Sequence, residues 1–455
     1  MATSSTTSRS NDMELQHLDI EATLAVGEMA TRTSSASLSA STETAVSDNI
    51  AANLIAQVTS FAGSYANLNE LFEKSWNSRN SALPSQASWR GESADFPQGH
   101  SFYASDQHGR SHAFYDAYNM YSRTAHMGIL DPSYDVFTSE YGHGALIYKV
   151  QNRTAVITGD PLCPVSHFDQ LLKEFQCKKQ LKLAFMGIGQ QFAEYAADKG
   201  WTTMHFGRER VLNPLTNKVL RQLSGKRMVA QSRRLLDPKR IGLVADIYCP
   251  GRSGRDSTLE AEIQSLYDAW RMERNSKNEG GNQAFVTEYD LFSDPDIALY
   301  LYIRDREGSV VGLAVLRSLG ATCGFHLDPC IASPTAPSGV TDLLPILSMI
   351  LLRGTGIAYL SFGYEPFPEI CDISGQRKLK ASLTRWGYRR VLETVNVGGK
   401  VSYHDKFHPD ENLESDLYTV IPKGSLQVQQ SAAIMHVANI KLRRLLLSNH
   451  RQTVS

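Results

Sequence analysis

The chain has 455 residues, of which 42% are hydrophobic and 20% are charged. This composition suits a protein with a large core, and it excludes collagen-like and wholly disordered classes. The 46 basic and 47 acidic residues nearly cancel, so any nucleic-acid-binding surface must be a local patch. The six cysteines include no C-x-x-C pair, which disfavours a zinc ribbon or a disulfide framework and suits a reducing compartment.

The sequence predicts neither a membrane span nor a secretory signal. The longest apolar run, Leu343 to Leu352, falls short of the ~20 residues that cross a bilayer. The N-terminus lacks a basic segment followed by an apolar one. We therefore expect a cytoplasmic protein whose membrane contact, if any, is peripheral.

The N-terminal region predicts a low-complexity tail. Residues 1 to about 50 are rich in Ser, Thr and Ala, which bury too little apolar surface to offset the entropy of ordering. The segment from Ile50 to Phe72 could form a helix, and a linker containing Ser, Asn and Pro follows it. We assign residues 1–98 to this mostly disordered tail and linker.

The next part of the chain predicts a hairpin followed by alternating helices and strands. The hairpin has strands at 144–150 and 154–158 around a turn at 151–153. The elements after it are a helix at 168–175, a strand at 181–186, a helix at 190–199 and a strand at 201–206.

The second half repeats this order loosely. Its elements are a helix at 259–274, strands at 298–304, 309–317 and 323–327, a helix at 342–353, a strand at 357–362, and a final helix and strand. We therefore predict an α/β (α+β) protein with two related modules, at 99–250 and 251–425, and a C-terminal segment at 426–455. The order is typical of N-acyltransferase-like folds, and many other α+β domains share it.

A basic stretch lies between the two modules. Residues 208–240 contain ten cations and only two acids, Glu209 and Asp237. This density suits a phosphate-binding surface, and a solvated helix face is the alternative. The candidates for nucleic-acid contact are Arg208, Arg210, Lys226, Arg227, Arg233 and Arg234.

A second cationic segment lies at residues 434–451. It combines apolar residues with Lys441, Arg443, Arg444 and Arg451, and it contains no acid. Such a pattern predicts a basic amphipathic helix that could rest on a membrane surface. Packing of this helix against the domain is the alternative that we favour.

Familiar catalytic motifs are absent from the sequence. There is no G-x-x-x-x-G-K-[ST] loop, no H-E-x-x-H and no G-x-S-x-G. The tripeptide Gly159-Asp160-Pro161 after the hairpin indicates a tight strand exit, which is ordinary turn chemistry.

Polar residues gather at two predicted strand ends in the second half. His326 and Asp328 end one strand, and Gly363 and Glu365 end the next. Ligands of open α/β sheets collect outside the carboxyl ends of the strands, so the two carboxylates would meet at one mouth. A turn role for Asp328 and a buried structural role for His326 stay open.

Two further polar residues are candidates for the same site. Asp342 opens an apolar helix after the loop that ends in Gly339, where a carboxylate stabilises the helix through its macrodipole. Lys406 lies in a short aromatic segment and could grip a phosphate or carboxylate. A lone lysine in such a segment is more often a surface residue on an edge strand.

Together, these segments resemble the C-terminal catalytic domain of the phosphatidylglycerol lysyltransferases, the multiple peptide resistance factor family, from about His108 to Pro422. The matching motifs of the first half are Gly159-Asp160-Pro161, Gly200-Trp201, Gly225-Lys226-Arg227 and Ser232-Arg233-Arg234. Those of the second half are Leu327-Asp328, Ala336-Pro337-x-Gly339-x-x-Asp342, Gly363-x-x-Pro366 and Asp405-Lys406-Phe407.

The resemblance implies a fold and a reaction. The fold would be a tandem pair of acetyltransferase-like (GNAT-type) modules that moves an amino acid from aminoacyl-tRNA to a lipid hydroxyl. It implies no cofactor beyond the aminoacyl-tRNA co-substrate, and no metal. Asp328 and Lys406 match the family's aspartate and lysine, and His326 and Glu365 are the further catalytic candidates.

Departures from the family pattern bear on the substrate. Bacterial lipid-modifying members carry an arginine three residues after the aspartate, where this chain has Ile331, and the multispanning flippase region is absent. A freestanding domain with a Ser/Thr-rich tail resembles the fungal ergosteryl amino-acid synthases. Without a synthetase domain it looks most like the ergosteryl-glycine synthases. The expected reaction moves glycine from glycyl-tRNA to the 3β-hydroxyl of ergosterol and gives ergosteryl-3β-O-glycine.

Three alternatives stay open. The acceptor could be phosphatidylglycerol or another lipid, the donor could be an acyl-CoA, or the chain could bind RNA or membrane without catalysis. An acyl-CoA enzyme normally needs a Q/R-x-x-G-x-G/A loop, and neither Gln222 nor Arg317 begins one. The expected partners are glycyl-tRNA, ergosterol or another membrane lipid, a membrane surface and a glycyl-tRNA synthetase.

Overall fold

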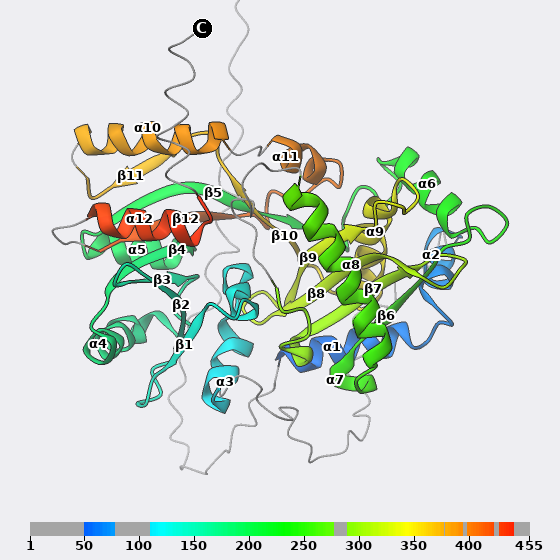
Figure 1. The fold of residues 1–455 in the computed structure, drawn as a ribbon, viewed down its shortest axis with the longest axis horizontal. Helices are drawn as coiled ribbons and strands as arrows, with labels where there is room; N and C mark the ends of the chain where they lie inside the picture. Colours follow the sequence, from blue (N-terminus) through cyan, green and yellow to red (C-terminus); the bar gives the residue numbers. More distant parts are fainter. Residues whose placement is uncertain are drawn as a thin grey trace, which may run out of the picture. The chain divides into compact units, whose positions relative to one another are not determined.

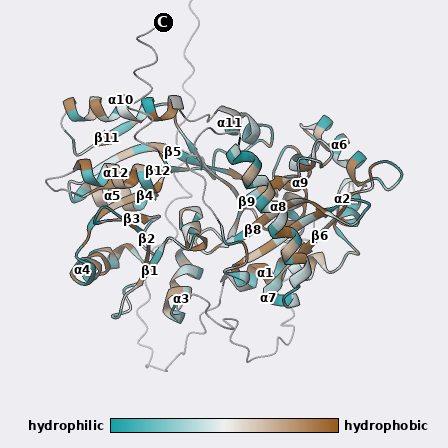
Figure 2. Ribbon diagram, in the orientation of Figure 1, coloured by the Kyte–Doolittle hydropathy of each residue, from teal (hydrophilic) through white to brown (hydrophobic). Residues whose placement is uncertain are grey.

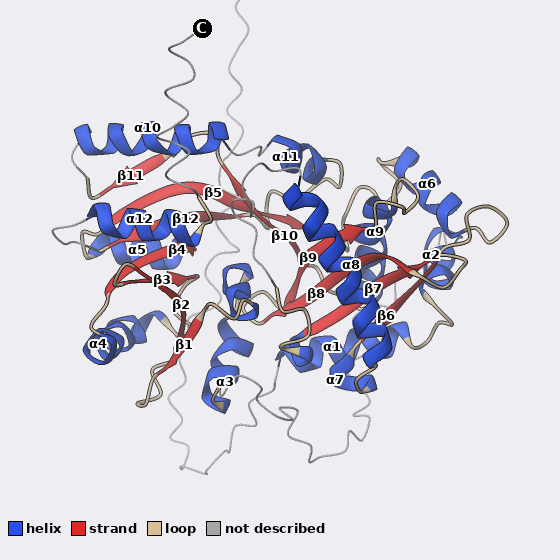
Figure 3. Cartoon of the chain, in the orientation of Figure 1, coloured by secondary structure: helices blue, strands red, loops and turns tan. Residues whose placement is uncertain are grey.

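The computed structural model describes residues 50–77, 110–276, 289–376, 378–394, 398–422 and 427–440. In these ranges twelve strands form one mixed sheet, shown in Figure 1, and helices cover both of its faces (Figure 3). The predicted α/β fold class is therefore confirmed. The predictions for residues 1–49, 78–109 and 441–455, including the tail and the four C-terminal cations, lie outside the described residues.

The first half of the sheet is built on the predicted hairpin. Its turn residues Asn152 and Arg153 have φ values of 49° and 57°, the left-handed pair that a two-residue hairpin turn requires. The strand after the hairpin runs parallel to the second strand of the hairpin, because a helix connects the two. The elements are β1 (Asp135–Thr138), β2 (Ala145–Gln151), β3 (Thr154–Thr158), α4 (Phe168–Lys179), β4 (Lys182–Ile188), α5 (Gln190–Asp198) and β5 (Thr202–Leu212).

The second half forms the other end of the sheet. Four strands make an antiparallel ladder, and the fifth returns parallel to the fourth after a crossover helix. These elements are β6 (Val244–Tyr248), β7 (Ala298–Arg304), β8 (Val310–Leu319), β9 (Gly324–Ala332), α9 (Val340–Gly354) and β10 (Leu360–Pro366).

The two halves exchange strands. β12 (Ser415–Ile421), near the end of the chain, lies between β4 and β5 of the first half. β5 also pairs with β10 and with the short strand β11 (Asp372–Ser374). β6, which precedes the predicted boundary at residue 250, pairs with β7 of the second half. The predicted division into modules stays a prediction, and the sheet is continuous across it.

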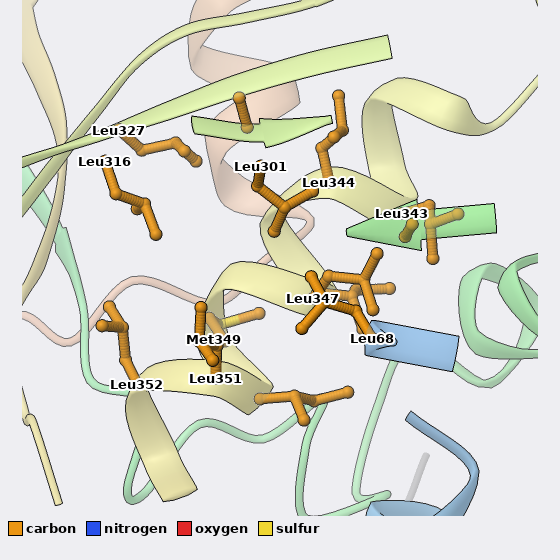
Figure 4. Packing of buried hydrophobic residues seen from close by; sticks show 14 of the residues in the cluster. Leu68, Leu301, Leu316, Leu327, Leu343, Leu344, Leu347, Met349, Leu351 and Leu352 are labelled. Atoms are coloured by element: carbon orange, nitrogen blue, oxygen red, sulfur yellow. The ribbon is translucent and has the colours of Figure 1, made fainter. Parts of the chain in front are cut away.

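The core lies on both faces of the sheet because strand residues alternate between them. In β7, Leu299, Leu301 and Ile303 enter one cluster, and Ala298 and Tyr300 enter the other. The first cluster contains α9, whose leucines pack on β7 to β9 in Figure 4. Figure 2 shows the same strands as a hydrophobic zone. A helix that is apolar on all sides needs cover on all sides, which α9 has.

Part of that cover comes from the N-terminal region. Residues 50–77 form two helices, α1 (Ile50–Ala62) and α2 (Leu68–Asn77), which pack on α9. Val58 and Phe72 are completely buried, and Trp76 is 3% exposed. Residues 50–77 are therefore part of the folded domain and not of a disordered tail. The helix predicted from Ile50 to Phe72 is present as two shorter helices.

The remaining helices lie around these two halves. They are α3 (His112–Tyr121), the 3-10 helix η2 (Thr124–Leu130), η3 (Val165–His167), α6 (Lys226–Leu236), α7 (Pro250–Ser253), α8 (Ser257–Ser276), η4 (Pro295–Ile297), α10 (Lys378–Thr394), α11 (Gly398–Asp405) and α12 (Gln427–Val437). α12 packs on β3 and β4 through Ala433 and Val437, so the described start of the C-terminal segment lies against the domain. Of the helices in the described ranges, none combines the length and apolar content needed to cross a bilayer.

Candidate active site

The second half of the sheet forks between β9 and β10. Phe325 pairs with Leu360 and His326 with Ser361, and the two strands share no further pair. Beyond this point β9 stays paired with β8, and β10 stays paired with β5. Residues after the fork therefore lie on diverging strands, where open α/β sheets hold their ligands.

Asp328 and Glu365 lie on the two arms of this fork. Glu365 is the penultimate residue of β10, which ends at Pro366 as predicted, whereas β9 continues past Asp328 to Ala332, so Asp328 does not end its strand. β9 is extended by its hairpin neighbour β8, and β10 pairs with β5, which is distant in sequence. That both carboxylates border one opening stays a prediction.

Asp328 is held by two residues that the sequence did not single out. The hydroxyl of Tyr289 donates a hydrogen bond to its carboxylate. Arg317 donates from Nη1 to its backbone oxygen at 2.9 Å, and the Arg317 guanidinium lies 4.5 Å from the centre of the Tyr289 ring. The contacts fix both the backbone and the side chain of Asp328.

Arg317 is completely buried. Its Nε and Nη2 atoms have no hydrogen-bond partner among the described residues, although burying an unpaired cation is costly. The contacts that the structure provides for this cation are the backbone oxygen of Asp328 and the ring of Tyr289. The sequence signal was a single arginine in the otherwise apolar strand 310–319.

His326 lies two residues before Asp328 and is 4% exposed. Its Nδ1 lies 3.3 Å from the backbone oxygen of Ser361, which assigns the proton to Nδ1 and leaves Nε2 as an acceptor. Burial lowers the pKa of His326, so the ring is neutral near pH 7. Gly363 has a φ of 85° and faces this ring; a Cβ there would lie 3.2 Å from His326 Cε1. Both roles of His326 stay open.

Glu365 belongs to a network of ion pairs with Arg208 and Arg210. Arg208 Nη2 lies 3.0 Å from Glu365 Oε1, and Arg210 Nε lies 3.4 Å from Glu365 Oε2. Arg210 also contacts Asp405 at 2.5 Å and Glu414 at 2.9 Å. Because its buried guanidinium already faces three carboxylates, Arg210 is withdrawn from the candidates for tRNA contact.

Both arginines lie in this network because β5 is longer than the strand predicted at 201–206. The strand continues through Arg208 and Arg210 and pairs with β10, so both arginines lie beside Glu365. The local charge count could not reveal this, because Glu365 is 157 residues from Arg208 along the chain. Arg208 is partly exposed, with a third of its side chain accessible.

Lys400 on α11 contacts one arm of the fork. Its Nζ donates to the backbone oxygen of Tyr364 at 3.0 Å, and burial lowers its pKa against the opposing charges of Asp328 and Glu365. The neighbouring His404 has its pKa lowered to about 3 by burial and by the charges of Lys400 and Arg210. Lys400 is a functional candidate that the sequence missed, because nothing local marks a lysine in a glycine-rich segment.

Lys406 and Asp342, both singled out from the sequence, form an ion pair. Lys406 Nζ also lies 4.2 Å from the centre of the Tyr403 ring, a distance at which a cation is attracted by an aromatic face. Asp342 stands in the first turn of α9, so its predicted role at the helix N-terminus stays open. Tyr403 lies beside Cys330 of β9 and donates to the backbone oxygen of Thr341 at 2.7 Å.

A pocket of about 430 Å³ lies beside β3, β4, β5 and β10. Its charged lining residues are Arg123, Asp160, Glu194 and Glu209. Asp160 accepts a hydrogen bond from the backbone N–H of Gly189 at 2.9 Å, and burial raises the pKa of its carboxyl. Three acids against one cation make this pocket suited to an ammonium group.

Glu209 is the second functional candidate that the sequence missed. It is 3% exposed, and it accepts hydrogen bonds from the hydroxyls of Thr124 at 2.5 Å and Ser415 at 3.4 Å. In the sequence it was one of two acids in a basic stretch and the end of the matching segment Phe206-Gly207-Arg208-Glu209, without a role of its own. Its place in the pocket depends on Thr124 and Ser415, which are 85 and 206 residues away along the chain.

Gly159 is required by the wall of this pocket. Its φ is 75°, and a Cβ there would lie 2.5 Å from Nε2 of His126. His126 is buried and joins two residues that line the pocket. Its Nδ1 accepts a hydrogen bond from the backbone N–H of Arg123 at 2.8 Å, and its Nε2 donates to the backbone oxygen of Asp160 at 2.8 Å. The turn Gly159-Asp160-Pro161 thus holds Asp160 at the pocket.

Four of the six predicted tRNA contacts lie on α6. Lys226, Arg227, Arg233 and Arg234 are exposed, while the opposite face packs on α9. Gly339, with a φ of 99°, gives room to Gln231 of this helix, whose amide donates to the oxygen of Ser338 at 2.5 Å. This contact ties α6 to the loop before Asp342.

Among the described residues, no group of His, Cys, Asp or Glu side chains has the arrangement of a metal site. The contacts form three groups: Asp328 with Tyr289 and Arg317, Lys406 with Asp342, and Glu365 with Arg208 and Arg210. Carboxylates, a neutral imidazole and ammonium groups are side chains of the kinds that acyl transfer uses.

Comparison with known proteins places the chain in a family. The family model "Phosphatidylglycerol lysyltransferase, C-terminal" matches residues 112–418, more than half of the chain. A search of curated proteins found no match.

Two solved structures share the fold. L-PGS from Bacillus licheniformis is 18% identical, with a TM-score of 0.55 over 73% of this chain and 96% of that chain. The C-terminal domain (DUF2156) of a lysylphosphatidylglycerol synthetase assigned in Agrobacterium fabrum is 18% identical, with a TM-score of 0.53 over 70% and 93%. The chain belongs to the phosphatidylglycerol lysyltransferase C-terminal family, and it is an aminoacyltransferase that uses aminoacyl-tRNA.

Proposed function

We propose that this lipid aminoacyltransferase moves glycine from glycyl-tRNA to the 3β-hydroxyl of ergosterol and gives ergosteryl-3β-O-glycine. The observation that carries the choice of acceptor is the environment of Ile331. It is 2% exposed and lies in the apolar cluster of Tyr267 and Tyr300, where the lipid-modifying bacterial relatives carry an arginine. A phosphate headgroup needs a cation, whereas a sterol offers only a hydroxyl.

The reaction is a transesterification. The oxygen of the acceptor attacks the carbonyl carbon of the aminoacyl ester, the bond from that carbon to the ribose oxygen breaks, and the acceptor proton ends on the ribose. Asp328 would take this proton or hold the α-ammonium of glycine, and Tyr289 would orient it. The acidic pocket at Asp160 and Glu209 offers a second place for the ammonium.

The other site residues would act on the ester and the tRNA. Lys406 would contact the terminal adenosine or polarise the ester carbonyl, and Lys400 lies where it could assist. His326 is the alternative proton acceptor, through Nε2. Glu365 would hold Lys400 and Arg208 in place. No cofactor besides the aminoacyl-tRNA enters this scheme.

The exposed face of α6 would hold the tRNA backbone. Its four cations are exposed, although the Arg233 guanidinium also lies 5.8 Å from the centre of the Trp76 ring. Contacts of such cations with phosphates are sequence-independent and weaken as salt rises. Glycine has no side chain to recognise, so selection of the donor would come largely from the tRNA. A glycyl-tRNA synthetase as a partner stays a prediction.

An acyl-CoA donor is disfavoured by the first turn of α9. A pyrophosphate is bound by free N–H groups at such a helix start, and here Asp342 places a carboxylate there. The alternative loop after Arg317 is excluded because that side chain is completely buried. Transfer to phosphatidylglycerol is the second candidate, which the family supports and Ile331 disfavours.

Mass spectrometry of lipids from a bacterial host tests the proposal. The host makes this protein and receives ergosterol, and the expected product is a sterol ester of glycine mass that purified reactions lose on RNase treatment. An aminoacylated phosphatidylglycerol instead would show that phosphatidylglycerol, and not ergosterol, is the acceptor. No modified lipid, with charged tRNA confirmed, would overturn lipid transfer.

A further inference from the structure

The outer face of α10 carries an apolar stripe. Leu379, Leu383 and Trp386 are 88%, 67% and 59% exposed, and their spacing of four and three residues places them on one side of the helix. Among the described residues, few large apolar side chains are this exposed, and here three of them are neighbours. Figure 2 shows hydrophobic segments along α10 between polar ones.

The inner face fixes the orientation of this helix. Ala381 and Val391 are buried, and the hydroxyl of Tyr388 donates to the backbone oxygens of Phe206 and Phe367, both at 2.9 Å. In Figure 1, α10 lies along the outside of β11 and β5. The stripe therefore points away from the sheet and cannot turn inward without breaking the hydrogen bonds of Tyr388.

Cations border the stripe on both sides. At 100° per residue, Lys378 and Arg389 fall on one flank of the stripe, Lys380 falls on the other, and Arg390 falls in line with it, one turn after Trp386. The helix has five basic residues and one acid in its sequence. Arg389 contacts Glu369 at 2.6 Å, which offsets its charge, so the flanking charge comes chiefly from Lys378 and Lys380.

We propose that α10 lies in the headgroup region of an anionic bilayer, with the stripe at the boundary of the acyl chains. An interfacial helix has an apolar face, lysine and arginine on its flanks and a tryptophan at headgroup depth. The flanking cations favour an anionic lipid surface over a neutral protein groove, since each one gains attraction near anionic headgroups.

α10 lies close in the chain to two proposed site residues. α11 follows it within a few residues and carries Lys400, and Lys406 comes directly after α11. A bilayer held at α10 would therefore lie beside the segment that carries two proposed site residues. The inference rests on the proposed function in this respect only: a lipid acceptor is what makes the membrane contact useful.

The test is co-sedimentation of the full chain with vesicles, without tRNA. We expect binding to phosphatidylcholine vesicles that contain roughly one third phosphatidylserine, and binding weaker by about tenfold or more in Leu379→Asp/Leu383→Asp. Tyr141→Asp is the matched control, because Tyr141 is 74% exposed on a distant turn. Lys378→Glu/Lys380→Glu should abolish binding to the anionic vesicles, which tests the charges without touching the stripe.

Several results would overturn the inference. One is unchanged binding in both double variants, and another is equally weak binding in the Tyr141 control. A dimeric wild type that becomes monomeric in the leucine variant, with vesicle binding intact, would assign the stripe to a second copy. Circular dichroism confirms that the variants are folded.

The two proposals fail separately. Vesicle binding through α10 with no aminoacylated lipid overturns the proposed function alone. Lipid transfer with vesicle binding that ignores α10 overturns this inference alone.

Discussion

The hydroxyl of Tyr289 donates a hydrogen bond to the carboxylate of Asp328, which is 39 residues away in sequence. The same aromatic ring lies over the buried guanidinium of Arg317, which donates to the backbone of Asp328. One tyrosine therefore joins a buried cation to the carboxylate at the fork of the sheet. This arrangement gives Asp328 a fixed direction, which a group that orients a substrate needs.

Asp328→Asn should abolish transfer and leave tRNA affinity unchanged, because the amide can neither take a proton nor pair with an ammonium. Tyr289→Phe keeps the ring over Arg317 and removes only the hydroxyl. A hydrogen bond to a charged group is worth roughly 1.5–3 kcal/mol, so kcat should fall about tenfold or more. Single-turnover kinetics with filter binding of tRNA measure both. Normal turnover in Asp328→Asn would end its assignment to the site.

Variants of the Lys406–Asp342 ion pair distinguish a catalytic role of Lys406 from a structural one. If Lys406 acts on the ester, Lys406→Met should abolish transfer, Asp342→Asn should reduce it less, and the double variant should match Lys406→Met. Both side chains are partly exposed, so removal of the pair should cost only up to about 1 kcal/mol of unfolding free energy. An equal drop in activity in the two single variants would instead assign the pair to support of α9.

The cations of α6 should control tRNA affinity and its salt dependence. Arg233→Glu/Arg234→Glu should weaken binding and reduce the slope of log affinity against log salt by about one for each phosphate that the helix no longer neutralises. Lys173→Glu/Arg252→Glu is the control: both of its residues are exposed and lie on other helices, and the change in net charge is the same. Equal weakening in both variants would show that the net charge of the protein, and not the position of the cations on α6, controls tRNA affinity.

Gly159 and Gly142 have the same φ of 75°, but only Gly159 faces a buried ring. Gly142→Ala should therefore cost about 1 kcal/mol of unfolding free energy, from the left-handed backbone alone. Gly159→Ala adds a collision with His126 and should cost at least about 2 kcal/mol more. Urea denaturation of both variants measures the difference. Equal costs would show that the His126 ring moves aside and accommodates the added methyl group.

Burial of His126 should make the protein sensitive to mild acid. Its pKa is lowered to about 4 by burial, with a smaller contribution from Arg123, whereas an exposed histidine titrates near 6.5. The unfolded chain therefore binds this proton more tightly, and stability falls as the pH drops from about 6.5 toward 4. The decrease from this one group is about 2 kcal/mol between pH 7 and pH 5. Urea denaturation at both pH values, compared with His126→Gln, should show a smaller decrease in the variant.

The local elements and their order follow from the amino-acid sequence alone. The turn at Asn152 and Arg153, the alternation in the strands and the apolar run of α9 all act between residues close in the chain, so they can be read locally. The same holds for residues 50–77, where the predicted helix is present as two helices. The motifs of the family resemblance, Leu327-Asp328 among them, were also local, and their order along the chain led to the family.

The partners of these elements are a matter of the three-dimensional fold. β5 pairs with strands from both halves, and this pairing turns Arg210 from an expected phosphate contact into a partner of Glu365, Asp405 and Glu414. The fold also placed Tyr289 on Asp328, and it left the leucines of α10 exposed where a local pattern would have buried them. Strand pairing and burial depend on contacts between residues far apart in the chain, and no local pattern encodes which of several compatible partners will meet.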